Sequence, residues 1–447
     1  MNIDFNKIEV TEEYSKAEGF LNSPNGVGNN LLFISGKPGV GKSVLIHYLD
    51  KKYGKQKNIV KVANTGNAAL NVEGQTIHSF FGVPIGIADV RNVNVKPKDA
   101  QKLRALDILI IDEVSMVRAD LMDYINVKLQ MARKNNLPFG GVKVIIVGDL
   151  FQLSPVADND ESKMLRMMGY KGNYFFHSHT FSDLDYYILH LTKVKRTNDE
   201  KLKEILNSIR LGENLKESIG YLNRNHHGIK GEHLKKERDI VLTARNRTAN
   251  FINDKRLREI DAPEKLFTAT IAGHFKQKML TPEHLKLKVG AQVMITINDN
   301  LRNQYFNGDV ATVLSFGGGE IRVKVHRTGR QVSLKREKWS SYKYDLINGS
   351  LEKEEVGFFE QYPLCLGWAF SIHKSQGLTL SSVAIDLDDK GAFAAGQLYV
   401  ALSRLVTLEH DEDTKTGLTL LTPLRISSVI VDNEVLKYYD SVVDKEI

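Results

Sequence analysis

The chain has 447 residues, of which 42% are hydrophobic and 26% are charged, and this composition excludes a disordered or fibrous protein and predicts roughly three globular domains. Its single cysteine, Cys365, excludes an intramolecular disulfide framework, and no apolar run approaches the ~20 residues that a membrane span needs. The net charge of +7 is compatible with a polyanionic partner, and denser basic stretches occur at Lys51–Lys61, Lys230–Arg238 and Arg322–Lys338.

The chain carries no signal for export and no zinc motif. Its first residues, Met1–Phe5, lack the basic and apolar regions of a secretion signal, and its cysteine and histidines do not have the spacing of zinc ligands. Together with the single cysteine, these features favour a reducing compartment, and we expect a bacterial cytoplasm.

A phosphate-binding loop is the first motif along the chain. The apolar run Leu31–Ile34 predicts a buried strand, Val44–Leu49 predicts a helix, and the residues from Gly36 to Ser43 between them read G-x-x-x-x-G-K-S. In this context the backbone N–H groups of the loop face phosphate oxygens, and the helix adds its positive N-terminal dipole. We expect Lys42 to neutralise β- and γ-phosphate charge and the Ser43 hydroxyl to bind Mg²⁺. The expected nucleotide contacts are Gly36, Gly39, Val40, Gly41, Lys42, Ser43 and Val44.

Three more apolar runs, Ile59–Val62, Ile108–Ile111 and Val144–Val147, predict further strands of a parallel α/β sheet. Asp112 and Glu113 directly follow the second of these strands. After a phosphate loop, an aspartate at this point can hold Mg²⁺ and the adjacent glutamate can polarise the attacking water. The alternative is a pair of solvated acids that cap the next helix.

Three polar residues later in the chain are candidates for the chemistry of phosphoryl transfer. Gln152 follows the strand Val144–Val147, where it could sense the γ-phosphate and orient water. Arg196 and Arg404 are candidate arginine fingers, because cationic groups stabilise the charge on a transferred phosphoryl group. As isolated arginines, both would instead be surface ion-pair residues.

The second half of the chain repeats the α/β pattern, with predicted strands at 187–191, 240–243, 293–297 and 383–387. Between them, Phe306–Trp339 has short alternating runs broken by Asn307-Gly308-Asp309 and by the three glycines at 317–319. These are signals of antiparallel hairpins, and they predict a small β-barrel inserted in the second unit. In the first half, the polar stretch Pro84–Lys102 is expected to be a small excursion from the sheet.

Taken in order, these motifs resemble those of the Pif-one family of DNA helicases, in class B of helicase superfamily one. The resemblance runs nearly end to end. It includes Ala63–Asn71, Gly74–Phe81, Asp112–Met116 and Gly148–Val156, and a helical stretch from Asp120 to Arg133 that is similar to the family's signature segment. The late motifs Trp368–Thr379 and Gln397–Arg404 are highly specific.

The resemblance implies an α/β fold with two RecA-like parallel-sheet motor domains and a small β-barrel insertion in the second. We place the first domain at 1–186, with its excursion at about 84–102, and the second at 187–447, interrupted by the barrel at about 300–358. The implied activity is ATP-dependent 5′→3′ movement on single-stranded DNA with unwinding of duplexes. ATP and Mg²⁺ are the implied cofactors. The implied partners are single-stranded DNA and forked or tailed duplexes, with no membrane, and the protein is expected to be monomeric.

The resemblance also assigns residues. Lys42, Ser43, Asp112, Glu113, Gln152, Arg196 and Arg404 take the ATPase roles described above, and Gln376 is implied to lie near the γ-phosphate and link it to the DNA track. Short polar or cationic groups suited to phosphates, and one aromatic ring that could stack on a base, form the implied DNA contacts: Thr65, Asn71, His78, Phe80, His373, Lys374, Ser375 and Thr379. Phe81 or Trp368 could also stack, but Phe80 and Phe81 are equally suited to a core.

Some positions depart from the family pattern, and some alternatives stay open. Tyr14 stands where the family usually has a glutamine that reads adenine, so adenine could stack on an aromatic ring instead, and Asn64 replaces a usual proline. The acidic segment Glu409–Thr416 resembles a solvated insertion. A GTPase switch lacks a guanine-reading N-K-x-D segment, and the complete set of phosphate-facing residues argues against a scaffold with a dead ATPase. An RNA-directed or hybrid-directed motor, or an ATPase that does not unwind, remains an alternative.

Overall fold

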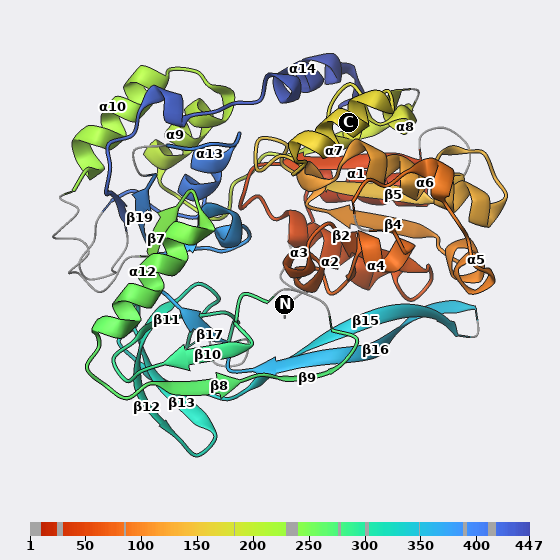
Figure 1. The fold of residues 1–447 in the computed structure, drawn as a ribbon. Coiled ribbons are helices and arrows are strands. Elements are labelled where there is room, and N and C mark those ends of the chain that lie inside the picture. The colour runs from red at the N-terminus through yellow and green to blue at the C-terminus, as the bar shows by residue number, and fades with distance from the viewer. Residues whose placement is uncertain are drawn as a thin grey trace.

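A computed structural model of the chain describes residues 10–24, 30–84, 86–182, 184–228, 240–275, 279–299, 304–347, 349–387, 391–409 and 417–447. The basic stretch Lys230–Arg238 lies outside the described residues, as does the acidic segment beyond Glu409. Figure 1 shows three bodies: an α/β unit from the N-terminal half, a second α/β unit, and an antiparallel β unit beneath them.

The first unit is built on a six-stranded parallel sheet in the order β3-β2-β4-β5-β1-β6. Its inner strands are buried along their whole length, as expected for apolar runs in a sheet covered on both faces. The strands are β1 (Leu31–Gly36), β2 (Ile59–Ala63), β3 (Gln75–Thr76), β4 (Ile108–Asp112), β5 (Lys143–Gly148) and β6 (Tyr187–Leu191).

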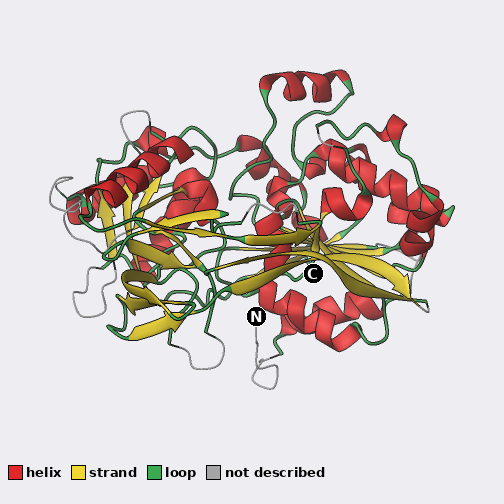
Figure 2. Cartoon of the chain, turned by 60° about the horizontal axis from the view of Figure 1, so that its bottom comes forward, coloured by secondary structure: helices red, strands yellow, loops and turns green. Residues whose placement is uncertain are grey.

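Helices pack on both faces of this sheet, and Figure 2 shows them above and below its strands. Successive residues of β1 point to opposite faces, so that Leu31 and Phe33 join one core cluster and Leu32 and Ile34 join another. The helices are α1 (Glu12–Asn22), α2 (Lys42–Tyr53), α3 (Gly66–Asn71), α4 (Ile77–Phe81), α5 (Pro97–Arg104), α6 (Ala119–Arg133), α7 (Asn159–Met167) and α8 (His179–Ser182).

The position of strand β6 contradicts one prediction from the sequence. It was expected to open the second unit, but it pairs in parallel with β1 and forms the edge of the first sheet. The boundary at residue 187 is therefore wrong, because the chain leaves the first unit only after Leu191. The predicted excursion contains a helix, α5, that packs against α6.

The second unit has a four-stranded parallel sheet in the order β18-β7-β19-β20. The strands are β7 (Ile240–Thr243), β18 (Ala369–Ser371), β19 (Ser382–Asp386) and β20 (Gly417–Leu420). The later helices of the chain are α9 (Glu200–Leu211), α10 (Leu215–His226), α12 (Asn246–Glu259), α13 (Gln397–Leu402) and α14 (Asn433–Ser441).

Among the described residues between α12 and β18, ten strands form the antiparallel β unit. They pair in three sheets, β10-β8, β14-β13-β12-β11-β17 and β15-β16-β9. The strands are β8 (Lys265–Thr268), β9 (Thr270–Gly273), β10 (His284–Leu287), β11 (Gln292–Ile295), β12 (Val310–Gly317), β13 (Glu320–Val325), β14 (Gln331–Leu334), β15 (Glu337–Ile347), β16 (Ser350–Gln361) and β17 (Leu364–Leu366).

The antiparallel unit is larger than the sequence suggested. It runs from Lys265 to Leu366, beyond the predicted limits of about 300 and 358. The run at 293–297, which was assigned to the second α/β sheet, contributes instead to β11 and pairs antiparallel with β12 and β17. Closure of these sheets into a barrel stays a prediction.

Two segments reach across to the first unit. The long β15–β16 hairpin runs beneath its helices (Figure 1), where the Tyr344 hydroxyl accepts from the Lys61 N–H and Asn58 accepts from the Leu351 N–H. At the other end of the chain, α14 packs on the first unit: the Tyr439 hydroxyl lies 2.7 Å from Ser35 Oγ at the end of β1. No described helix is both long enough and apolar enough to cross a lipid bilayer.

Candidate nucleotide and DNA sites

The phosphate loop joins β1 to α2, as the sequence predicts. Gly39 and Gly41 have φ values of 81° and 95°, a conformation that residues with a Cβ rarely adopt, and Gly41 is the N-cap of α2. The loop backbone therefore turns toward the positive N-terminal end of the helix, an arrangement that suits phosphate oxygens. Val40 is buried, whereas Ser43 and Val44 are half-buried in the first turn of α2.

The Lys42 side chain folds back over the loop. Its amine donates to the carbonyl oxygens of Gly36, at 2.7 Å, and Lys37, at 3.1 Å. Burial lowers the pKa of this amine, while the carboxylates of Asp149, Glu113 and Asp112 act to raise it. The Lys42 amine thus lies near three carboxylates beside the loop, where a nucleotide's phosphates would be placed.

Asp112 and Glu113 lie at the carboxyl end of β4. Burial, followed by the charge of Glu113, raises the pKa of Asp112 to about 7, and burial also raises the pKa of Glu113. Glu113 adopts a left-handed conformation with φ of 55°, which turns its side chain out of the strand direction. Asp112 is buried and Glu113 is half-buried, so they are not a pair of freely solvated acids, and a bound cation would offset their charge.

Gln376 bridges the two α/β units. Its Nε2 donates to Glu113 Oε2 at 2.6 Å, from the segment that follows β18. This bond places a side chain of the second unit directly on the expected catalytic carboxylate of the first. The expectation that Gln376 lies near the γ-phosphate stays a prediction.

Arg196 lies against the phosphate loop. A Cβ added at Gly39 would lie 2.4 Å from the Cβ of Arg196, so glycine is required for this close approach. The Lys195 N–H donates to the Gly39 carbonyl, and the Arg196 guanidinium donates to the Ser403 carbonyl at 2.7 Å. Arg196 therefore connects the loop of the first unit with the end of α13 in the second.

Arg404 is buried at the interface, with only 2% of its side chain exposed. Its guanidinium donates to the carbonyls of Val400 and Leu378 and to Ser403 Oγ. Burial, and then the charge of Arg196, lower its pKa to about 9, while Glu113 acts to raise it. It is not a surface ion-pair residue, and its charge acts on the same carboxylate that Gln376 contacts.

Gln152 lies in a loop that packs tightly against α13. The side chain is 9% exposed, and the loop's carbonyls at Phe151 and Gln152 both lie 2.5 Å from the position that a Cβ on Gly396 would take. Gly396 is the N-cap of α13, with φ of 75°. The two units can therefore approach this closely at Gln152 because Gly396 has no side chain.

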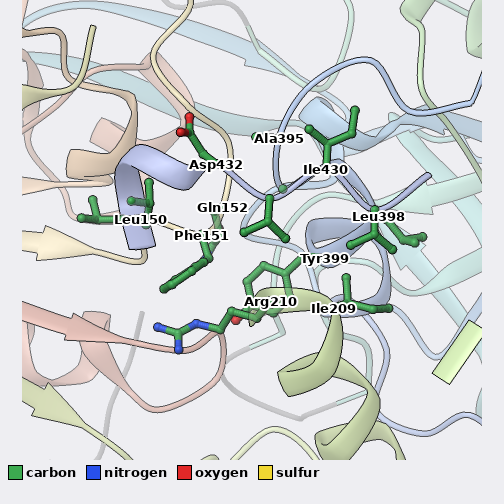
Figure 3. A pocket seen from close by; sticks show the side chains of 14 residues that line it. Leu150, Phe151, Gln152, Ile209, Arg210, Ala395, Leu398, Tyr399, Ile430 and Asp432 are labelled. Carbon is green, nitrogen blue, oxygen red and sulfur yellow. The ribbon is translucent and has the colours of Figure 1, made fainter. Parts of the chain in front are cut away.

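Three further residues connect the units around Gln152, and the sequence analysis did not single them out. The Tyr399 hydroxyl, from α13, donates to Asp149 Oδ2 at 2.9 Å, and Arg210 Nε, from α9, lies 3.7 Å from Asp149 Oδ1. The Arg210 guanidinium also covers the Phe151 ring at 4.0 Å, and Figure 3 shows Phe151, Arg210 and Tyr399 among the side chains that line one pocket. The position of Asp149 after a buried strand was a signal that could have identified it.

The residues fit a magnesium nucleotide. Ser43 offers a hydroxyl, and Asp112 and Glu113 offer carboxylates whose pKa is raised mainly by burial. Among the described residues, no group of three or more His, Cys, Asp or Glu side chains forms a protein cage for a metal. Mg²⁺ usually takes one or two protein ligands and completes its shell with phosphates and water, so the hydroxyl of Ser43 and the carboxylate of Asp112 would be enough to hold it.

The expected DNA contacts are divided between the two units. Asn71, Lys374 and Thr379 are exposed, and Thr65, His78 and His373 are half-buried. Asn71 of the first unit lies beside the second, because a Cβ on Gly377 would meet its Nδ2 at 3.5 Å. Asn71 therefore lies where the units adjoin, next to the segment that carries Lys374 and Thr379.

Two of the expected DNA residues are buried. Phe80 is 3% exposed and packs against Phe81, Tyr344 and Lys102. Ser375 is fully buried, and its hydroxyl donates to the Ile372 carbonyl. Burial of Phe80 supports the core interpretation, and neither side chain can reach a strand of DNA in this structure.

Two further predictions concern aromatic rings. Trp368 is 8% exposed and belongs to the core of the antiparallel unit. Tyr14 is 5% exposed and packs edge-on against Tyr48, so its ring has little free face for adenine. At the remaining departure, Asn64 donates to the Met116 carbonyl, a bond that proline could not make.

Comparison with known proteins agrees with this geometry. A model of the PIF1-like helicase family matches residues 15–218. The ATP-dependent DNA helicase Pif1 of Bdellovibrio bacteriovorus is 31% identical over 97% of this chain and 92% of its own length. The zebrafish ATP-dependent DNA helicase PIF1 is 31% identical over 90% of this chain, which spans 61% of that longer relative.

Solved structures give the same result. A crystal structure of Bacteroides Pif1 with ADP-AlF4 has a TM-score of 0.87 and 32% identity, and covers 98% of both chains. Bacteroides Pif1 bound to single-stranded DNA has a TM-score of 0.67 and 33% identity over the same share of each chain. With a relative above 30% identity that it covers almost completely, the chain belongs to the family of PIF1-like helicases.

Proposed function

We propose that the chain is an ATP-dependent DNA helicase that moves 5′→3′ on single-stranded DNA and unwinds duplexes as a monomer. Forked and tailed duplexes are its proposed substrates, and hydrolysis of ATP with Mg²⁺ drives its movement. The observation that carries this proposal is that two side chains from beyond the first unit reach its expected ATPase residues: Gln376 of the second unit donates to Glu113, and Arg196 lies against Gly39 of the phosphate loop. The relatives' names, and the single-stranded DNA bound to a Bacteroides neighbour, support it.

The proposed mechanism begins at the phosphate loop. The amine of Lys42 leaves the carbonyls of Gly36 and Lys37 and turns to the β- and γ-phosphates, which replace these partners. Mg²⁺, held by Ser43 and Asp112, supplies charge stabilisation to the phosphates when it is bound. Glu113 accepts a proton from the attacking water, and Gln152 orients that water.

Hydrolysis is completed by the second unit. The guanidiniums of Arg196 and Arg404 stabilise charge that develops on the transferred phosphoryl group. Because Gln376 donates to Glu113, a change at the phosphates alters a bond between the units. The units then close and open around ATP, and we propose that each grips the strand in turn through its own set of exposed polar residues.

Two experiments test this proposal. Lys42→Ala should abolish DNA-stimulated ATP hydrolysis while most of the DNA binding remains, and retained wild-type turnover would refute the assignment. Duplexes with a single-stranded 5′ or 3′ DNA tail test direction, and only the 5′-tailed substrate should open. A matched set with RNA tails separates the DNA motor from an RNA-directed one.

A further inference from the structure

Phe393 is an exposed aromatic residue at the end of the second sheet, and none of the sequence motifs gives it a role. Its side chain is 54% exposed, and it follows β19 and precedes α13. Its backbone is held firmly, because the buried side chain of Gln397 accepts from the N–H groups of Phe393 at 2.9 Å and Ala394 at 3.4 Å.

The fold brings two further side chains to this ring. Arg245 follows β7, His373 follows β18 and Phe393 follows β19, and these three strands are neighbours in the parallel sheet. The guanidinium carbon of Arg245 lies 5.1 Å from the centre of the Phe393 ring, and the His373 ring lies 6.1 Å away with an angle of 16° between the planes. The carboxyl ends of parallel strands are where such sheets bind their ligands.

The chemistry of this cluster suits one part of a nucleic acid. An exposed ring offers a face on which any base can stack, and an arginine beside it can meet the adjoining phosphate. Lys374 is exposed next to His373, so the cluster is continuous with residues already expected to contact DNA. We propose that Phe393 and Arg245 form a platform on which one base of the single strand stacks.

This inference rests on the proposed function and adds a base contact that replaces the stacking role expected of the buried Phe80. It predicts a contact that is insensitive to base identity, because every base has an aromatic face. It also assigns different roles to the two residues: Phe393 contacts a base, whereas Arg245 contacts the backbone.

The test is binding of a fluorescein-labelled single-stranded DNA oligonucleotide, measured by anisotropy, with a matched oligonucleotide that carries abasic sites. Phe393→Leu, which keeps apolar bulk, should weaken binding of the natural strand about tenfold and leave binding of the abasic strand unchanged. Phe393→Trp should bind like the wild type. Arg245→Gln should weaken binding of both the natural and the abasic strand, and it should reduce the dependence of affinity on salt by about one counterion.

Phe251→Leu is the control, because Phe251 is also highly exposed, at 62%, but lies within α12 away from the strand ends. Unfolding temperatures of all variants report on folding. If Phe393→Leu binds the natural strand as the wild type does, or if its affinity falls equally for the natural and the abasic strand, the inference is wrong and the helicase proposal stands. If wild-type protein binds no single-stranded DNA, the proposed function itself fails.

Discussion

Gly396 determines how closely the two α/β units approach at Gln152. An alanine Cβ there would lie 2.5 Å from two carbonyl oxygens, whereas ordinary contact begins at 3.4 Å, so Gly396→Ala must move α13 or the loop by about 0.9 Å (3.4 minus 2.5). A misplacement on the order of 1 Å in an active site can cost roughly 100-fold in rate. We therefore expect ATP turnover at saturating single-stranded DNA to fall between about 10- and 100-fold.

Gly329→Ala is the matched control for this variant. Gly329 has a similar φ of 67°, but no heavy atom of the described chain lies within 4 Å of the position of its added Cβ. Both variants should lose about 1–2 kcal/mol of unfolding free energy from backbone strain, and only Gly396→Ala should lose turnover. Wild-type turnover in Gly396→Ala, or an equal loss in Gly329→Ala, would refute the argument.

Three further predictions concern Gln376, Asp112 and Tyr439. Gln376→Glu places a carboxylate on Glu113 and should reduce DNA-stimulated hydrolysis more than Gln376→Leu does, as steady-state kinetics will show; equal losses would contradict a role for the hydrogen bond. Asp112→Asn should stabilise the nucleotide-free protein increasingly as pH rises from about 4 to about 7, because between the unfolded and folded pKa values of Asp112 the folded state alone keeps the proton, and the wild type loses stability as pH rises; a pH-independent difference in unfolding free energy would contradict this. Tyr439→Phe removes a hydroxyl that lies 2.7 Å from Ser35 Oγ and should cost about 1 kcal/mol in a denaturant titration, whereas a neutral result would mean that this contact is not formed in solution.

Much of the nucleotide site could be predicted because its signals are local. The phosphate loop and the acidic pair after β4 are short segments whose spacing and flanking strands fix their chemistry. The two arginines required a resemblance to a family, since an isolated arginine has no local signal. The burial of Arg404 and the position of Arg196 against the phosphate loop then followed from the fold, which brings the two units together.

The incorrect predictions concern long-range pairing. The pattern of 187–191 shows that it is a strand but not which sheet it joins, and it pairs with β1 across about 150 residues of chain. The run at 293–297 has the same ambiguity, because buried antiparallel and parallel strands are both apolar. Phe80 could not be placed by sequence, because its burial depends on Tyr344 of a distant hairpin.

The contacts of Tyr399 and Arg210 with Asp149 were not predictable for the same reason. Arg210 lies in the amphipathic helix α9, Tyr399 lies within the late motif Gln397–Arg404, and only the folded chain brings the two side chains to one carboxylate. These contacts surround Gln152, so the interface is organised in part by side chains whose partners could not be read from their motifs.

The central claim is tested most directly by the Arg196→Ala variant, for which both the rate of ATP hydrolysis and the affinity for a fluorescent ATP analogue are measured. The claim is that the second unit and its connection complete an ATPase site begun by the phosphate loop. Affinity should change by only a few fold, while the rate constant for hydrolysis should fall by roughly 1,000-fold or more, as for loss of an arginine finger. Hydrolysis at the wild-type rate would show that the site is complete within the first unit, and would contradict the account.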